Sequence, residues 1–238
     1  MKQALAPLFL ILLAVVLWRV VPMTPPDAIS ELGRHFVGYG VAENRAANLV
    51  TGVIVNYRGL DTLGEVSVLF LSVTGAGFLL RRHSGLVLAT PTPASELVQT
   101  AARLLFGPIL LFGAYIFTHG HLTPGGGFQG GAIVASSVLL LLLANRDRSL
   151  NHSLLGWIES MSGFLYVIVG LVGLAMAGSF LSNKGMIPLG AWNTLFSAGF
   201  IPVIYIFVGL KVGSELASLI DVMMHTGEPE AMTEGEAL

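Results

Sequence analysis

The chain has 238 residues, of which 54% are hydrophobic and 11% charged, and its mean hydropathy is +0.78. These values exclude an ordinary soluble domain and indicate an integral membrane protein. A formal net charge of −2 argues against a nucleic-acid partner, because binding phosphates requires clustered Lys and Arg. Without cysteine, the chain can form no disulfide, thiolate-held iron–sulfur cluster or c-type haem attachment, so any redox cofactor is expected in another subunit.

Apolar runs predict the membrane spans. A bilayer core of about 30 Å requires roughly 20 mostly apolar residues per helix. The runs that meet this requirement cover residues 4–22, 62–80, 99–118, 128–145, 157–181 and 196–220. The first is interpreted as a retained helix because no small-x-small cleavage site follows it. The predicted fold class is therefore an all-α integral membrane protein with about six transmembrane helices.

Basic residues near the span ends predict the orientation, because cytoplasmic loops collect Lys and Arg. One side of the six-span arrangement carries Lys2, Arg81, Arg82, Arg146 and Arg148. We therefore expect this side, and with it both termini, to face the cytoplasm.

Changes in composition predict the domain organisation. Segment 23–61 is the least membrane-like part and is expected to hold a short surface helix. A loop at 83–98, which contains Pro91 and Pro93, separates a two-helix segment at 1–82 from a four-helix domain at 99–225. The acidic tail at 226–238 is expected to be disordered.

A glycine-rich turn is predicted between the third and fourth helices. Six of the twelve residues from 120 to 131 are glycine, a density that suits closely packed irregular backbone. Gly125, Gly126, Gly127, Gly130 and Gly131 are the expected packing positions. At membrane depth such backbone survives only where protein or a water-filled cavity satisfies its polar groups, so the turn is expected to pack against neighbours.

Four polar side chains accompany these glycines: His119, His121, Thr123 and Gln129. A metal site at the two histidines would need further ligands that the nearby sequence does not offer. We therefore interpret both as interfacial residues that titrate near neutral pH and cap a helix end. The glycine spacing also matches a dinucleotide fingerprint, which we reject because it follows an apolar helix and not a strand.

Ionisable residues inside the spans are the candidates for an ion or proton path. Arg58, Asp61 and Glu65 lie at helical spacing near the start of the second span. Two interpretations stay open for them. They form a boundary ion pair that sets the depth of the helix, or Glu65 belongs to a proton or cation path.

Lys211 and Glu215 lie one turn apart in the last span and are expected either to form a salt bridge or to handle ions. Glu159, at the start of the fifth span, is interpreted as a helix-dipole partner.

Two motifs resemble known families. Residues 121–132, His-Leu-Thr-Pro-Gly-Gly-Gly-Phe-Gln-Gly-Gly-Ala, and the Gly-Leu-Lys-Val-Gly stretch at 209–213 resemble the MnhB family, the B subunits of the Mrp (Mnh-type) multisubunit sodium/proton antiporters. Residues 57–65, Tyr-Arg-Gly-Leu-Asp-Thr-Leu-Gly-Glu, are similar to the C-terminal end of the large Mrp A subunit, or to the small subunit that replaces this end in membrane-bound hydrogenases. The chain therefore looks like a fusion of the two. The resemblance implies that the glycine-rich turn acts structurally, with Thr123 and Gln129 supplying hydrogen bonds.

The resemblance implies a small subunit of a prokaryotic cytoplasmic-membrane complex that exchanges Na⁺ against H⁺, with no turnover and no catalytic or metal-binding residue of its own. The implied partners are large antiporter-like subunits and small membrane subunits, and also hydrogenase or other redox subunits where such a module is attached. The alternatives are a structural scaffold that assembles the ion-conducting subunits without transporting, and the membrane anchor of a redox enzyme.

Overall fold

The computed structural model describes residues 2–20, 29–82, 94–145, 148–183 and 187–225, and all regular secondary structure in them is helical. The helices are α1 (Lys2–Val20), α2 (Glu31–Asn44), α3 (Leu49–Thr51), the π-helix η1 (Gly52–Tyr57), α4 (Gly59–Arg82), α5 (Glu96–Thr118), α6 (Gly127–Ala144), α7 (His152–Ala177) and α8 (Ile201–His225). Within the described residues, α4 to α8 are long and apolar enough to cross a membrane. This confirms the predicted all-α membrane class.

The structure divides into two compact units, Met1–His35 and Phe36–Leu238. In the first unit, α1 overlaps the predicted span 4–22, of which residues 21–22 lie outside the described part. Its described apolar part covers Leu10–Arg19. In the segment 23–61, α2 is the predicted short helix, and its side chains are mostly exposed.

Several span ends differ from the prediction for local reasons. α7 begins at His152 and not at 157, because the Asn151 side chain accepts a 3.0 Å hydrogen bond from the Leu154 amide. It ends before Gly178, whose φ of 75° is left-handed and stops the helix. α8 begins at Ile201 and not at 196, because Ala198 and Gly199 also have positive φ, 66° and 58°.

The loop predicted at 83–98 is shorter at its C-terminal end, because α5 begins at Glu96 with Ser95 as its N-cap. Residues 83–93 of this loop and the tail predicted to be disordered, 226–238, lie outside the described residues.

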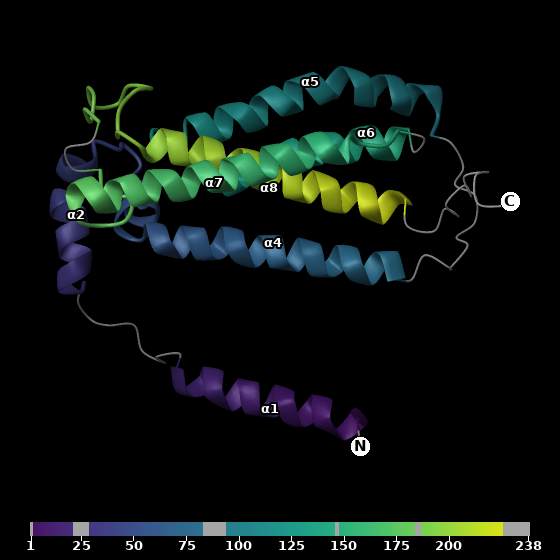
Figure 1. Ribbon diagram of the computed structural model, residues 1–238, viewed down its shortest axis with the longest axis horizontal. Coiled ribbons are helices and arrows are strands. Elements are labelled where there is room, and N and C mark those ends of the chain that lie inside the picture. Colours follow the sequence, from purple (N-terminus) through teal and green to yellow (C-terminus); the bar gives the residue numbers. More distant parts are fainter. Residues whose placement is uncertain (1, 21–28, 83–93, 146–147, 184–186, 226–238) are drawn as a thin grey trace, which may run out of the picture. The chain divides into compact units, whose positions relative to one another are not determined.

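α8 is the central helix of the second unit. It contacts α4, α5, α6 and α7, and these helices run side by side (Figure 1). In the membrane-spanning part of α8, 50% of the residues are buried within the described chain, compared with 6% in α4. The apolar core includes Ile204, Val208 and Val212 from α8. α8 is therefore shielded by its own chain, whereas α4 presents most of its surface outward.

Glycines let α5, α6 and α8 approach closely. A Cβ at Gly130 would lie 2.7 Å from the Gly113 carbonyl oxygen of α5, and one at Gly131 would lie 2.8 Å from the Gly209 carbonyl oxygen of α8. The glycine-rich turn itself ends at Gly126. The later glycines lie in the first turns of α6 and not in irregular backbone, because packing against two neighbouring helices outweighs the low helix propensity of glycine.

We expect Gly130→Ala to destabilise the protein by about 3 kcal/mol, at the upper end of overpacking costs, because the added methyl meets backbone as well as the Phe117 side chain. Thermal unfolding of the detergent-extracted protein, followed by size-exclusion chromatography, measures this loss. Gly107→Ala on α5 is the matched control, since a Cβ there meets no atom within 4 Å. Equal stability of the two variants would contradict the packing role.

Candidate functional site

A buried ion pair lies in the middle of α8. Lys211 Nζ is 2.6 Å from Glu215 Oε1, one helical turn away. Glu215 is fully buried, and its Oε2 has no hydrogen-bond partner among the described residues. Lys211 is the eleventh residue of α8, about 15 Å along the helix at a rise of 1.5 Å per residue, so the pair lies far from both ends of the span. Such a position costs energy that pairing only partly offsets.

Glu159 of α7 joins this pair. Its Oε1 lies 3.7 Å from Lys211 Nζ, and its side chain is 20% exposed. The helix-dipole interpretation of Glu159 was therefore incomplete, because α7 begins at His152 and places Glu159 in the second turn, facing α8. Phe70 of α4 adds a cation–π contact, with Lys211 Nζ 5.1 Å from its ring centroid. We call Glu159, Lys211 and Glu215 the charged triad.

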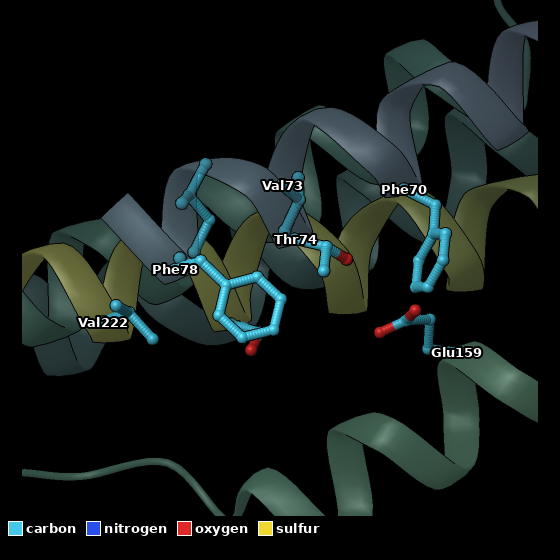
Figure 2. Close-up of a pocket in the computed structure, with 9 residues that line it drawn as sticks. Phe70, Val73, Thr74, Phe78, Glu159 and Val222 are labelled. Carbon is cyan, nitrogen blue, oxygen red and sulfur yellow. The ribbon is translucent and has the colours of Figure 1, made fainter. Parts of the chain in front are cut away.

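Two cavities flank the triad between α4, α7 and α8. One, of about 240 Å³, is lined by Glu159 together with Thr74 of α4 and Ser218 of α8. Figure 2 shows the Glu159 carboxylate facing the same cavity as the α4 side chains Phe70 and Thr74. The other, of about 170 Å³, is lined by Lys211 with Ser67, Ser162 and Tyr166. The larger cavity has polar and apolar lining, whereas the smaller one is lined mainly by apolar side chains, such as Leu63, Val66 and Phe207, beside its four polar residues. Both are large enough to hold water molecules at their polar groups.

A second buried carboxylate lies near the C-terminal end of α8. Asp221 is 2% exposed and accepts a 3.3 Å hydrogen bond from the Leu150 amide. His152 Nε2 lies 2.8 Å from Asp221 Oδ2, and His225 Nδ1 lies 3.3 Å from Oδ1. His152 is about half exposed, so this cluster connects a buried carboxylate with the end of the bundle.

Arg58, Asp61 and Glu65, which were predicted as one group near the start of the second span, lie in two different environments. Arg58 and Asp61 form an exposed ion pair, with Arg58 Nη2 2.5 Å from Asp61 Oδ2. Glu65 is exposed on the outer surface of α4, and no ion pair joins it to another described residue. A carboxylate on a membrane-spanning helix is usually paired or faces a polar cavity, and the described residues of the second unit give Glu65 no ion-pair partner.

The glycine-rich turn is held by the front part of the chain. Asn48 donates through Nδ2 to the carbonyl oxygens of Gly120, at 3.0 Å, and Thr123, at 3.1 Å. The Thr51 hydroxyl donates to the Gly120 carbonyl oxygen at 2.7 Å and accepts from the Tyr205 hydroxyl at 3.0 Å. These bonds satisfy the backbone of an irregular segment at the end of the bundle, and they join the front segment to the glycine-rich turn.

The other predicted polar residues of the turn have different environments. His119 is the C-cap of α5, its amide donating to the Tyr115 carbonyl oxygen, as expected. The Thr123 hydroxyl donates to the His119 carbonyl oxygen at 3.3 Å. The Gln129 side chain is exposed and makes no hydrogen bond to another described residue.

His121 is fully buried, and neither ring nitrogen has a hydrogen-bond partner among the described residues. Burial lowers its pKa from 6.5. The backbone of Thr194 and Leu195 offsets part of this effect, although neither forms a hydrogen bond of ordinary geometry to the ring. The interpretation of His121 as an interfacial residue titrating near neutral pH was wrong, because the turn folds its ring inward.

Among the described residues, no group of three or more His, Asp or Glu side chains is arranged to hold a metal ion. Sequence reasoning missed the roles of Glu159, Asp221, Asn48 and Thr51. A carboxylate in an apolar run was the available signal for the first two. For Asn48 and Thr51 no local signal existed, since their partners are about 70 residues away in the chain.

The lowered pKa of His121 predicts that folded-state stability depends on pH. The folded protein favours the neutral ring, so the stabilisation is complete above pH 6.5 and is lost as the pH falls from 6.5 through the folded pKa. Thermal unfolding in detergent at several pH values measures this, and His121→Gln should reduce the loss, whereas His119→Gln should retain it. An unchanged acid profile in His121→Gln would contradict the assignment.

Comparisons with known proteins match two adjoining parts of the chain. A domain described as related to the MnhB subunit of Na⁺/H⁺ antiporter matches residues 97–218, and the MbhE domain, named for the E subunit of MBH, matches residues 5–96. An uncharacterized protein of Methanocaldococcus jannaschii is 32% identical over 195 residues, which are 72% of this chain and 74% of the relative. The B subunit of the Na⁺/H⁺ antiporter of Bacillus subtilis is 40% identical over 91 residues, 37% of this chain, and the match spans only 63% of that relative.

Two solved structures contain a similar chain. One, in the membrane-bound sulfane sulfur reductase (MBS), an archaeal respiratory membrane complex, superposes with a TM-score of 0.76 at 42% identity and covers 94% of this chain and 98% of that chain. The other, in the Mrp complex from Dietzia sp. DQ12-45-1b, has a TM-score of 0.69 at 24% identity and covers 97% of this chain but 26% of that chain, so it shows the fold alone. The chain belongs to the family of membrane proteins that carry a domain related to the MnhB subunit of Na⁺/H⁺ antiporters.

Proposed function

We propose that this chain is a small, multi-pass membrane subunit of a cation/proton antiporter module that is attached to a redox-driven respiratory complex. The observation that carries the proposal is the match to the chain of the sulfane sulfur reductase complex, which extends over 94% of this chain and 98% of that one at 42% identity. Both segments occur there in a single chain, whereas the Dietzia chain is far longer. A stand-alone Mrp-type antiporter is the second candidate, favoured by the Bacillus subtilis relative.

The ions that the module exchanges would be Na⁺ and H⁺. The names of the relatives support this choice, and the buried charged residues of α8 support a role near charge movement. The chain would hold no cofactor, and electron transfer would belong to partner subunits. Its membrane would be the prokaryotic cytoplasmic membrane, with both termini in the cytoplasm, as the distribution of basic residues favours.

Mass-spectrometric identification of the subunits that co-purify with the C-terminally tagged chain in mild detergent tests the proposal. We expect large antiporter-like subunits together with iron–sulfur or other redox subunits. Recovery of Mrp-type subunits alone would favour the stand-alone antiporter. Recovery of this chain alone, folded and active in liposomes, would overturn both candidates.

Substitution of Glu65 distinguishes a transport role of this chain from a purely structural scaffold role. Its carboxylate lies on the outer surface of α4, so a transport role predicts that Glu65→Gln lowers sodium-coupled proton flux of the reconstituted complex by about 10²-fold, the low end for loss of a proton-transfer group, while assembly survives. Ser72→Ala is the control, because Ser72 is also exposed on α4 but bonds only to its own helix.

Unchanged flux in Glu65→Gln, combined with lost assembly in Gly130→Ala, would support the scaffold alternative for this chain.

A further inference from the structure

We propose that this chain contains a proton-transfer path of its own, between α4, α7 and α8, in which Lys211 carries the proton between the two cavities that flank it. The proposal rests on the proposed function and deepens it, because it assigns the proton, and not the metal cation, to this subunit. It also places the path inside the chain and not only at a subunit interface.

The charge of the triad points to a proton. One ammonium and two carboxylates within a membrane span leave one uncompensated negative charge, which is costly in a low-dielectric environment. A single added proton removes this charge. The ammonium of Lys211 already occupies the space between the two carboxylates, so a metal cation would have to displace it.

The Lys211–Glu215 pair leaves one oxygen of the Glu215 carboxylate without a hydrogen-bond donor among the described residues. This oxygen, Oε2, is buried, although buried carboxylates in structural ion pairs normally have further donors. The Lys211 ammonium therefore stabilises only one side of this carboxylate.

The side chain of Lys211 has room to move. Its Nζ lies 2.6 Å from Glu215 and 3.7 Å from Glu159, so a shift of under about 1 Å would bring Glu159 within hydrogen-bond distance. Gly163 of α7 adds no side chain beside Lys211, and a Cβ there would lie in ordinary contact, 3.4 Å from Lys211 Cδ and 3.7 Å from Nζ. A lysine on a flexible four-carbon stem suits such a movement.

The two cavities give the triad access from both directions. Glu159 lines the 240 Å³ cavity, and Lys211 lines the 170 Å³ cavity. Tyr166, which lines the smaller cavity, donates its hydroxyl to the Gly59 carbonyl oxygen at the start of α4. The larger cavity is also lined by Ser218 and Val222 of α8, and Val222 directly follows Asp221 in the chain.

The transfer balances in atoms and charge. In the neutral arrangement Lys211 is an ammonium, Glu215 a carboxylate and Glu159 a carboxylic acid. An N–H proton of Lys211 passes to water in the smaller cavity, and the O–H proton of Glu159 passes to the amine nitrogen. A proton from water in the larger cavity then restores Glu159. Each step breaks one N–H or O–H bond and forms another, so one proton crosses the triad with no redox change.

The proposal is tested by Glu159→Gln in the co-purified complex, reconstituted into liposomes that contain a pH-sensitive dye. We expect assembly to survive and proton flux to fall by about 10²-fold, the low end for loss of a proton-transfer group. Glu96→Gln is the matched control, because Glu96 is an exposed carboxylate in the first turn of α5. Gly163→Val, which narrows the space beside Lys211, should also lower the flux.

Flux of Glu159→Gln equal to that of the control would overturn the path but leave the proposed function intact, provided that the same subunits co-purify. If Glu159→Gln fails to assemble, a double variant, Lys211→Met with Glu215→Gln, tests the path instead. This double variant leaves no unpaired charge on α8 at this position. Assembly with lost flux supports the path, and either normal flux or failed assembly in this variant shows that the triad is structural.

Discussion

The close contact of α6 with α5 and α8 is the constraint on which the rest of the structure depends. It exists because glycines of α6 lie where any side chain would meet the backbone of a neighbouring helix, as Gly130 lies against Gly113 and Gly131 against the Gly209 carbonyl oxygen. In a membrane, helices gain little from hydrophobic burial, so packing at short range supplies much of their association. This contact makes α8 the centre of the unit, and α8 carries two buried carboxylates that pair with basic side chains.

The need to hydrogen-bond the backbone of the glycine-rich turn is the second constraint, and it links the two segments of the chain. The glycine-rich turn would be unstable without donors for its carbonyl groups, and Asn48 and Thr51 supply them from the front segment. The resemblance of the two segments to separate subunits in other complexes therefore has a structural counterpart, since the back segment depends on hydrogen bonds from the front one.

The distribution of charge separates two kinds of acidic residue. Glu215 and Asp221 are buried and paired within the chain, whereas Glu65 lies on the outward surface of a spanning helix. The first kind suits movement of charge inside the subunit, and the second suits contact with a neighbouring subunit. Both can serve the same complex, because a path through one subunit must continue into the next.

Apolar runs of about 20 residues determined the membrane class and the approximate spans, since a helix that crosses the bilayer core needs that length of apolar sequence. The i,i+4 spacing of Lys211 and Glu215 likewise permitted their pairing, because one helix holds both, and the structure contains the pair. Only the tertiary structure decided that Glu159 joins them, that His121 is buried, that Glu65 faces outward and that Asn48 holds the turn. Those facts depend on which surfaces of separate helices meet, and a local pattern carries no information about contacts between residues far apart in the chain.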